Sequence, residues 1–176
     1  MTALDDLLRL VPPPPGVTPV RWDGVVLPGG APPPADYRAL VDAYGPGRFD
    51  GFLWVLQPSS SNRYLDLGYQ TGAQLDALRV LRDEGEEIPF ELDDPATHAI
   101  AWAMTDNGDV VWWRRAPGAP PEAWTVAVTD SRGPYWDAYD GPATRFLHDV
   151  LTRRFTGTVF PEDFPSDAPR FDQGAR

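Results

Sequence analysis

Residues 101–113 of this chain have the sequence Ala101-Trp102-Ala103-Met104-Thr105-Asp106-Asn107-Gly108-Asp109-Val110-Val111-Trp112-Trp113. Two apolar, aromatic-rich runs flank the Asn-Gly pair, which is the strongest short-range sequence signal for a β-hairpin. Asparagine and glycine both tolerate the positive φ that a tight turn requires. Because the aromatic face of this hairpin must be covered, we predict that it lies at the centre of an antiparallel sheet.

The Asn-Gly turn is compatible with two strand registers. A two-residue loop places Trp102 opposite Trp113, whereas a three-residue loop with Gly108 as a left-handed bulge places Trp102 opposite Trp112. The first register also sets the two aspartates beside the turn opposite one another, and this like-charge pair disfavours it. Under that first register Trp112 points to the face opposite Trp102, so the register decides which tryptophan belongs to the core.

The size and composition of the chain predict one domain with a substantial core. It has 176 residues, 42% of them hydrophobic, which is enough to exclude wholesale disorder. Its 21 prolines and 16 glycines predict long connections between the elements. The absence of cysteine excludes disulfides, cysteine-ligated zinc and thiol catalysis, and it suits a reducing compartment.

The charge of the chain favours a basic protein partner. The formal net charge is −11, and every basic residue is an arginine. A negative field repels nucleic acid and anionic membranes and attracts basic surfaces. No apolar run approaches the ~20 residues needed to span a bilayer, and no basic region followed by an apolar core resembles an export signal. We therefore expect a cytoplasmic protein that binds neither membrane nor nucleic acid.

Hydrophobic periodicity predicts helices at both ends of the chain around a run of antiparallel strands. Residues 20–27 are compatible with a short strand or an anchored turn. In the helix over 74–84, Leu75, Leu78 and Leu81 share a face that we expect to be buried. The expected helices cover 2–11, 34–44, 74–84 and 143–151, and the expected strands cover 49–56, 97–105, 110–113, 124–128 and 135–139.

This pattern predicts an α+β fold, with a single domain in which helices flank a central twisted antiparallel sheet. We expect three parts in the chain. Residues 1–19 form an N-terminal helix and a proline-rich spacer, because four consecutive prolines follow the helix. Residues 20–165 form the domain, and residues 166–176 form a flexible C-terminal tail.

The inventory of catalytic motifs is poor. The sequence contains no glycine-rich phosphate loop, no nucleophile elbow and no zinc-binding helix. His98 lies near Asp93 and Asp94, but oxygen-rich turns with one histidine are usually solvated turns. Asp106 and Asp109 form a potential carboxylate pair, yet a hairpin tip is normally too wet to separate two pKa values. We predict no catalytic residues, no metal and no cofactor.

Three stretches resemble the SMI1/KNR4 (SUKH) superfamily, particularly its actinobacterial, immunity-like members. Leu27-Pro28 and the helix from Pro34 to Gly45 resemble the "LP-x-D/E-Y…YG" motif of that family. The hairpin at 101–113 resembles its "W-G-x-T-x-N-G-D…W" motif, and 143–151 followed by 159–161 resembles its usual ending. The resemblance covers residues 22–165 and implies one α+β domain with a central antiparallel sheet.

The resemblance also implies a function, because bacterial members are typically immunity proteins of polymorphic toxin systems. They bind and neutralise a cognate toxin, often a nuclease. We therefore expect a non-catalytic binding protein with a basic toxin domain as its partner. The alternative is a regulatory or scaffolding module with a non-toxin partner. The expected contact residues combine acidity with an aromatic side chain that can lose its water: Asp93, Asp94, Asp106, Asp109 and Trp112.

Overall fold

A computed structural model of the chain describes residues 2–133 and 135–174. These residues form four α-helices, one short 3₁₀ helix and seven strands in an open antiparallel sheet, so the expected α+β single-domain fold is confirmed. The helices are α1 (Ala3–Leu10), α2 (Ala35–Tyr44), α3 (Leu67–Asp83), η1 (Pro121–Ala123) and α4 (Ala143–Leu151). The strands are β1 (Gly47–Phe49), β2 (Leu53–Val55), β3 (Ile100–Thr105), β4 (Val110–Arg114), β5 (Thr125–Thr129), β6 (Trp136–Tyr139) and β7 (Phe171–Gln173).

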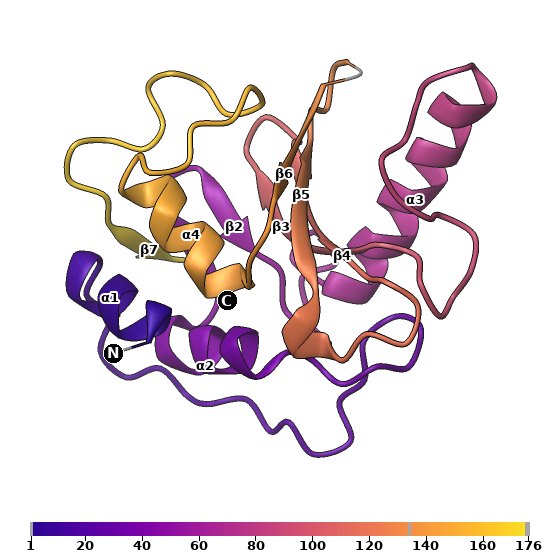
Figure 1. Cartoon of the computed structure of the whole chain (residues 1–176). Helices are drawn as coiled ribbons and strands as arrows, with labels where there is room; N and C mark the ends of the chain where they lie inside the picture. The colour runs from indigo at the N-terminus through magenta and orange to yellow at the C-terminus, as the bar shows by residue number, and fades with distance from the viewer. Residues whose placement is uncertain (1, 134, 175–176) are drawn as a thin grey trace.

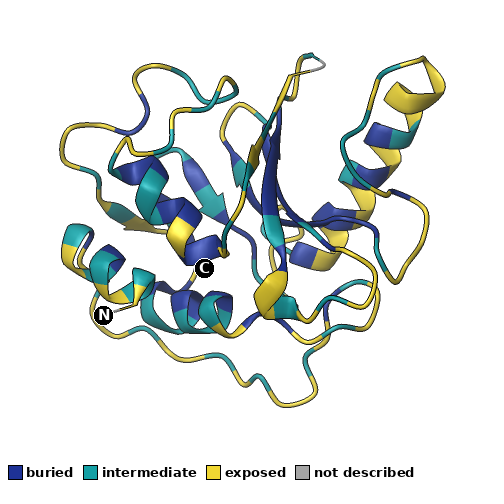
Figure 2. Cartoon of the chain, viewed as in Figure 1, coloured by how far each residue is buried: buried dark blue, intermediate teal, exposed yellow. Residues whose placement is uncertain are grey.

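The sheet has the order β6-β5-β4-β3-β2-β1-β7, with the predicted hairpin at its centre. Helices α1, α2 and α4 gather on one side of the sheet, and α3 lies on the other (Figure 1). The strands at the two ends of the sheet run in clearly different directions, as the twist of strands requires. The outer end of α3 extends past the sheet and is largely exposed (Figure 2).

The hairpin turn is a three-residue loop with a left-handed glycine. The Thr105 N–H donates to the Asp109 carbonyl at 2.9 Å, and the Gly108 N–H donates to the Thr105 carbonyl at 3.0 Å. Gly108 has a φ of 90°, which glycine adopts at low cost. Of the two registers compatible with the sequence, the structure has the one in which Gly108 is the bulge.

Trp102 nevertheless pairs with neither tryptophan of β4. Pairing runs from Met104 to Ala103, skips Trp102 and resumes at Ala101, which lies opposite Trp112. Trp102 is therefore the extra residue of a β-bulge. On the other side of β3, the Thr71 hydroxyl of α3 accepts from the Ala101 N–H at 3.1 Å and lies 3.4 Å from the Ala101 carbonyl. This side chain supplies the hydrogen bonds that β2 does not supply, because β2 ends at Val55.

The three tryptophans of the hairpin are buried on both faces of the sheet. Trp102 and Trp113 stack with ring centroids 5.8 Å apart, and they face α2 and α4 through Tyr37 and Phe146. Adjacent residues of a strand point to opposite faces, so Trp112 faces α3. The hairpin is therefore at the centre of the core. Truncating a buried aromatic of this size typically costs about 3–5 kcal/mol of unfolding free energy.

The predicted strand over 49–56 is two strands. Asp50 and Gly51 both have positive φ, 53° and 66°, and the Phe52 N–H donates to the Phe49 carbonyl at 3.0 Å. This Asp-Gly pair makes a tight turn between β1 and β2. The sequence predicts one internal strand here because apolar residues lie on both sides of the Asp-Gly pair, and the structure shows that this pair turns the chain.

Both ends of the chain pack against the domain predicted over 20–165. Leu7 and Val11 belong to the same hydrophobic core as the sheet, and the Tyr44 hydroxyl donates to the Val11 carbonyl at 2.6 Å. Helix α1 and the residue after it are therefore part of the same core as the sheet. In the predicted flexible tail, Phe171–Gln173 form β7, which pairs with β1. Residues 175–176 of that tail lie outside the described residues.

The helix predicted over 74–84 begins earlier, because Asp66 caps its first turn by accepting from the Tyr69 N–H at 2.7 Å. At its other end Gly85 has a φ of 102°, and the Glu86 N–H donates to the Leu81 carbonyl at 3.0 Å. This is a Schellman-type ending. Among the described residues, no helix has both the length and the apolar character needed to cross a bilayer.

Candidate protein-binding surface

Asp106, at the tip of the central hairpin, is exposed, as a contact residue should be. Its carboxylate is nevertheless bonded within the chain, because Arg48 Nη1 donates to it at 2.9 Å and Trp54 Nε1 at 2.6 Å. The Arg48 guanidinium also lies 5.0 Å from the centre of the Trp54 ring. Asp106 therefore joins the β3–β4 turn to β1 and β2 and carries a largely neutralised charge.

Asp109 and Trp112 are buried, so the prediction that they form part of an exposed contact surface is wrong. Asp109 is 3% exposed, and its carboxylate accepts from Thr105 Oγ1 at 2.7 Å and from the Ser131 N–H at 3.2 Å. Trp112 is 0% exposed, and its indole Nε1 donates to Thr129 Oγ1 at 2.9 Å. Both side chains turn inward because the bonding partners of their polar atoms lie on β5 and just after it.

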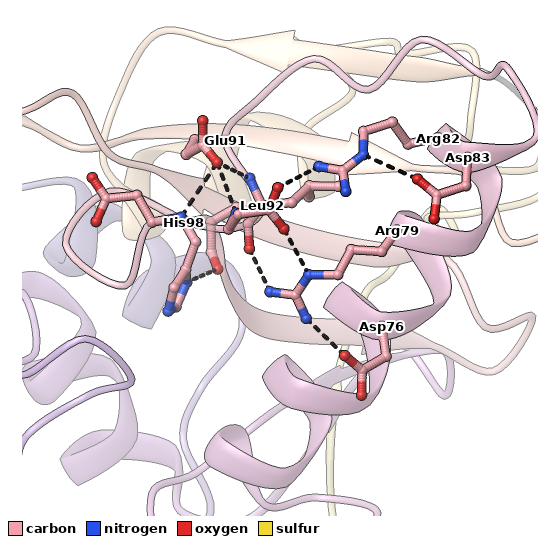
Figure 3. A network of polar contacts seen from close by, with 10 residues as sticks. Asp76, Arg79, Arg82, Asp83, Glu91, Leu92 and His98 are labelled. Carbon is pink, nitrogen blue, oxygen red and sulfur yellow. Dashed lines mark hydrogen bonds and ion pairs between the residues drawn. The ribbon is translucent and has the colours of Figure 1, made fainter.

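Asp93 accepts hydrogen bonds in a network that holds the segment after α3 against that helix. Figure 3 shows Arg79 and Arg82, the two arginines of α3 in this network. Arg79 Nε and Arg82 Nη1 donate to the two carboxylate oxygens of Asp93 at 3.0 and 2.6 Å. The Arg82 guanidinium, and then that of Arg79, hold the pKa of Asp93 below its usual value. Arg79 also donates to the Leu92 carbonyl at 2.6 Å. Asp93 is thus exposed, but its charge is compensated.

The turn that contains Asp94 is closed by its own carboxylates. Asp94 accepts from the Ala96 N–H at 2.9 Å and from the Thr97 hydroxyl at 3.2 Å. One oxygen of Glu91 faces three consecutive backbone N–H groups, those of residues 92–94. The N–H groups of Asp93 and Asp94 hold the pKa of Glu91 below its usual value. Asp94 is exposed, but its carboxylate already accepts hydrogen bonds within the turn, and this structural role accounts for an aspartate at this position.

His98 is a structural residue of this region. Its Nδ1 lies 2.8 Å from the Ala99 carbonyl, which can only accept, so Nδ1 carries the hydrogen. Burial lowers the pKa of His98 and favours the neutral ring. Within residues 2–133 and 135–174, no three histidine, aspartate or glutamate side chains are grouped closely enough to hold a metal ion.

A groove with apolar walls lies between the outer end of α3 and the tip of the β5–β6 hairpin. It is lined by residues from 78–89 on one side and from 129–133 and 135–136 on the other, and we call it the apolar groove. Its volume is about 240 Å³. Leu81, Tyr135 and Trp136 in its walls are 37%, 64% and 39% exposed. Large apolar side chains exposed together in a groove are typical of protein-binding sites.

Two of the predicted contact residues, Asp109 and Trp112, support the wall of the groove on the β5–β6 side from within the fold. Trp112 bonds Thr129, and Asp109 bonds the backbone of Ser131. The Ser131 hydroxyl also donates to the Asn107 carbonyl at 2.8 Å. Thr129 and Ser131 both line the apolar groove. Asp109 and Trp112 therefore act as positioning residues for this wall.

The opposite wall is held in the same way by the network of Figure 3. Asp93 and the Leu92 carbonyl fix the end of segment 86–93 to Arg79 and Arg82 on α3. Segment 86–89 is the part of this stretch that lines the groove. The two walls are thus tied to the fold by hydrogen bonds from separate elements.

The rim of the apolar groove is predominantly acidic. Three carboxylates line it, Glu86, Glu87 and Asp130, against one guanidinium, Arg132. Within the part of the chain that the structure describes, Glu86 and Glu87 make no ion pair with an arginine. Their charges therefore act outward, unlike those of Asp93 and Asp106. This arrangement attracts a basic surface.

The sequence does not predict the apolar groove, because hydrophobic periodicity does not tell which apolar side chains remain exposed. The spacing of Leu75, Leu78 and Leu81 predicted one buried face, but only Leu75 and Leu78 are buried. Trp136 and Ala138 are exposed on the edge strand β6, and the sequence predicts only a strand over 135–139 without indicating which face is covered. The available signal in the sequence is the aromatic pair Tyr135-Trp136 directly after Gly133-Pro134.

Comparison of the chain with protein-family models, with curated proteins and with solved structures finds no match.

Proposed function

We propose that this chain is a non-catalytic binding protein of the SMI1/KNR4 (SUKH) type, and that it is a cytoplasmic immunity protein that neutralises a basic toxin by direct binding. The observation that carries the proposal is the apolar groove with its uncompensated carboxylates Glu86 and Glu87. Exposed aromatic side chains in such a groove supply hot-spot contacts. The negative field of the chain increases the rate of encounter with a basic partner.

The packing of the motif residues supports the family part of the proposal. The three stretches that carry the resemblance form α2, the β3–β4 hairpin and α4 with the segment after it. Tyr37 of α2 contacts Trp113 with ring centroids 4.9 Å apart, and Phe146 of α4 contacts Trp102 at 6.0 Å. The three motif-bearing stretches thus pack together in one core, as they would if this chain had the fold of that family.

Co-expression tests the proposed function. Each protein encoded beside this chain is expressed in a sensitive host, with and without the chain, and growth and complex formation are measured. We expect one neighbour to be toxic alone, to be harmless with the chain, and to co-purify with it. No stable complex and no protection from any toxic neighbour would contradict the proposal. A stable complex with a neighbour that is not toxic would favour the regulatory or scaffolding alternative.

A further inference from the structure

The size of the apolar groove indicates what kind of ligand it takes. At about 240 Å³ it is smaller than the ~300–1,000 Å³ of sites that enclose a small-molecule ligand. It has the dimensions of a pocket for one or two protruding side chains. Leu78 and Ile88 give one apolar wall and Trp136 the other, so the inserted group must be apolar.

The charges around the groove indicate what surrounds that apolar group. Glu86 and Glu87 lie on one wall and Asp130 on the other, with Arg132 as the single opposing charge. A partner that buries an apolar side chain here brings its flanking residues to these carboxylates. Flanking lysine or arginine residues are attracted, and flanking acidic residues are repelled.

From these two features we propose that the apolar groove is the docking site for a basic segment of a partner protein, with a large apolar side chain as its anchor. This inference rests on the proposed function, because it assigns the contact surface of the same binding protein. A second copy of this chain is a poor occupant, since a two-fold contact would bring the two acidic rims together. Nucleic acid and anionic membranes are repelled by the same carboxylates.

A selection from a phage-displayed library of random dodecapeptides tests the docking site and does not require the partner itself. The full-length chain is the bait, and affinities of the enriched peptides are then measured by fluorescence anisotropy. We expect the peptides to combine an aromatic or large aliphatic residue with lysine or arginine within a few positions. We also expect their affinity to fall as the NaCl concentration rises from 50 to 300 mM.

Matched variants locate the binding site on the chain. Leu81→Ser/Trp136→Ser removes groove side chains, and we expect it to weaken binding about tenfold or more. Val80→Ser/Tyr64→Ser is the control, because Val80 and Tyr64 are also large exposed side chains but do not line the groove, and it should leave binding unchanged.

Charge variants supply a second test that leaves all apolar contacts in place. Glu86→Gln/Glu87→Gln should weaken binding severalfold at 50 mM NaCl and flatten the salt dependence. Glu122→Gln, which changes an exposed glutamate away from the groove, should do neither.

Several results would overturn the inference: no enrichment of peptides, peptides without basic residues, or equal affinity for the Leu81→Ser/Trp136→Ser protein. A dimer in analytical ultracentrifugation that this variant converts to a monomer would identify a second copy as the occupant and would also overturn it. Protection from a toxin that persists undiminished in the groove variant would refute the docking site and leave the proposed function standing. If peptides bind in the groove but no neighbouring protein is toxic, the docking site stands and the proposed immunity function is refuted.

Discussion

Replacing Asp109 by alanine removes a buried carboxylate that connects two loops. The carboxylate accepts from Thr105 Oγ1 at 2.7 Å and from the Ser131 N–H at 3.2 Å, and it is 3% exposed. The Ser131 hydroxyl is held by the same turn through the Asn107 carbonyl. The variant therefore leaves a buried hydroxyl and a partly buried N–H without their acceptor.

The size of the effect follows from those two bonds. A hydrogen bond to a charged acceptor contributes about 1.5–3 kcal/mol net. The bond from Ser131 is long, and Thr105 keeps its other bond, in which its hydroxyl accepts from the Asp109 N–H at 3.0 Å. We therefore expect a loss of about 2–4 kcal/mol in the free energy of unfolding. For a chain of this length a loss of ~3 kcal/mol lowers Tm by about 6–12 °C.

Urea unfolding followed by circular dichroism and by tryptophan fluorescence measures the loss. Asp106→Ala is the matched control, since it removes an aspartate of the same turn whose bonds to Arg48 and Trp54 are exposed. It should cost about 1 kcal/mol or less. Equal effects of the two variants, or a loss below 1 kcal/mol for Asp109→Ala, would refute the assignment of Asp109 as the buried member of the pair.

Three further variants test other parts of the fold. Thr71→Val removes the hydroxyl that satisfies Ala101 at the β-bulge and should cost about 1–3 kcal/mol in urea unfolding, whereas Thr71→Ser should cost less. Gly85→Ala meets no atom but forces alanine to a φ of 102°, so thermal unfolding should show a loss of about 1–3 kcal/mol. Burial opposes ionisation of Asp149, but hydrogen bonds from Tyr139 and the adjacent histidine outweigh it and place its pKa below the usual value. Its stabilising contribution is therefore present above the ordinary carboxyl pKa and is lost as pH falls through the lowered one, and Asp149→Asn should lose less stability than the wild type between pH 5 and pH 2.

Each of these variants has a contradicting outcome. Equal stability of Thr71→Val and the wild type would mean that water serves Ala101 equally well. An unchanged Tm in Gly85→Ala would show that the ending of α3 adopts another backbone conformation. An identical fall in urea midpoint with acid in Asp149→Asn and the wild type would place the acid sensitivity elsewhere.

The sheet and most helices are predictable because their signals are local. The Asn107-Gly108 turn, the apolar runs on either side of it and the helix-capping residues act within a few residues of one another. The β-bulge at Trp102 is not local, because it depends on where β2 ends and on the Thr71 hydroxyl from a helix 30 residues away. Strand β7 was missed for the same reason, since its partner β1 lies far away in the sequence.

The candidate surface was predictable only in its chemistry. The apolar groove has the predicted acidity and exposed aromatic side chains. The residues that the sequence analysis names for these features instead make hydrogen bonds within the fold. Asp109 and Trp112 are drawn inward by partners on β5 and just after it, and Asp93 and Asp106 are paired with arginines that periodicity does not place. Which acidic residue remains unpaired is a property of the tertiary structure.

Hydrogen–deuterium exchange of the full-length chain, with and without its bound partner protein, maps the surface that the partner covers. If the apolar groove is the docking site, protection on binding concentrates in residues 78–89 and 129–136, which include the walls of the groove, and exchange at the hairpin tip around Asp106 is unchanged. Protection centred on the tips of β1–β2 and β3–β4, with 78–89 and 129–136 unaffected, would contradict this prediction.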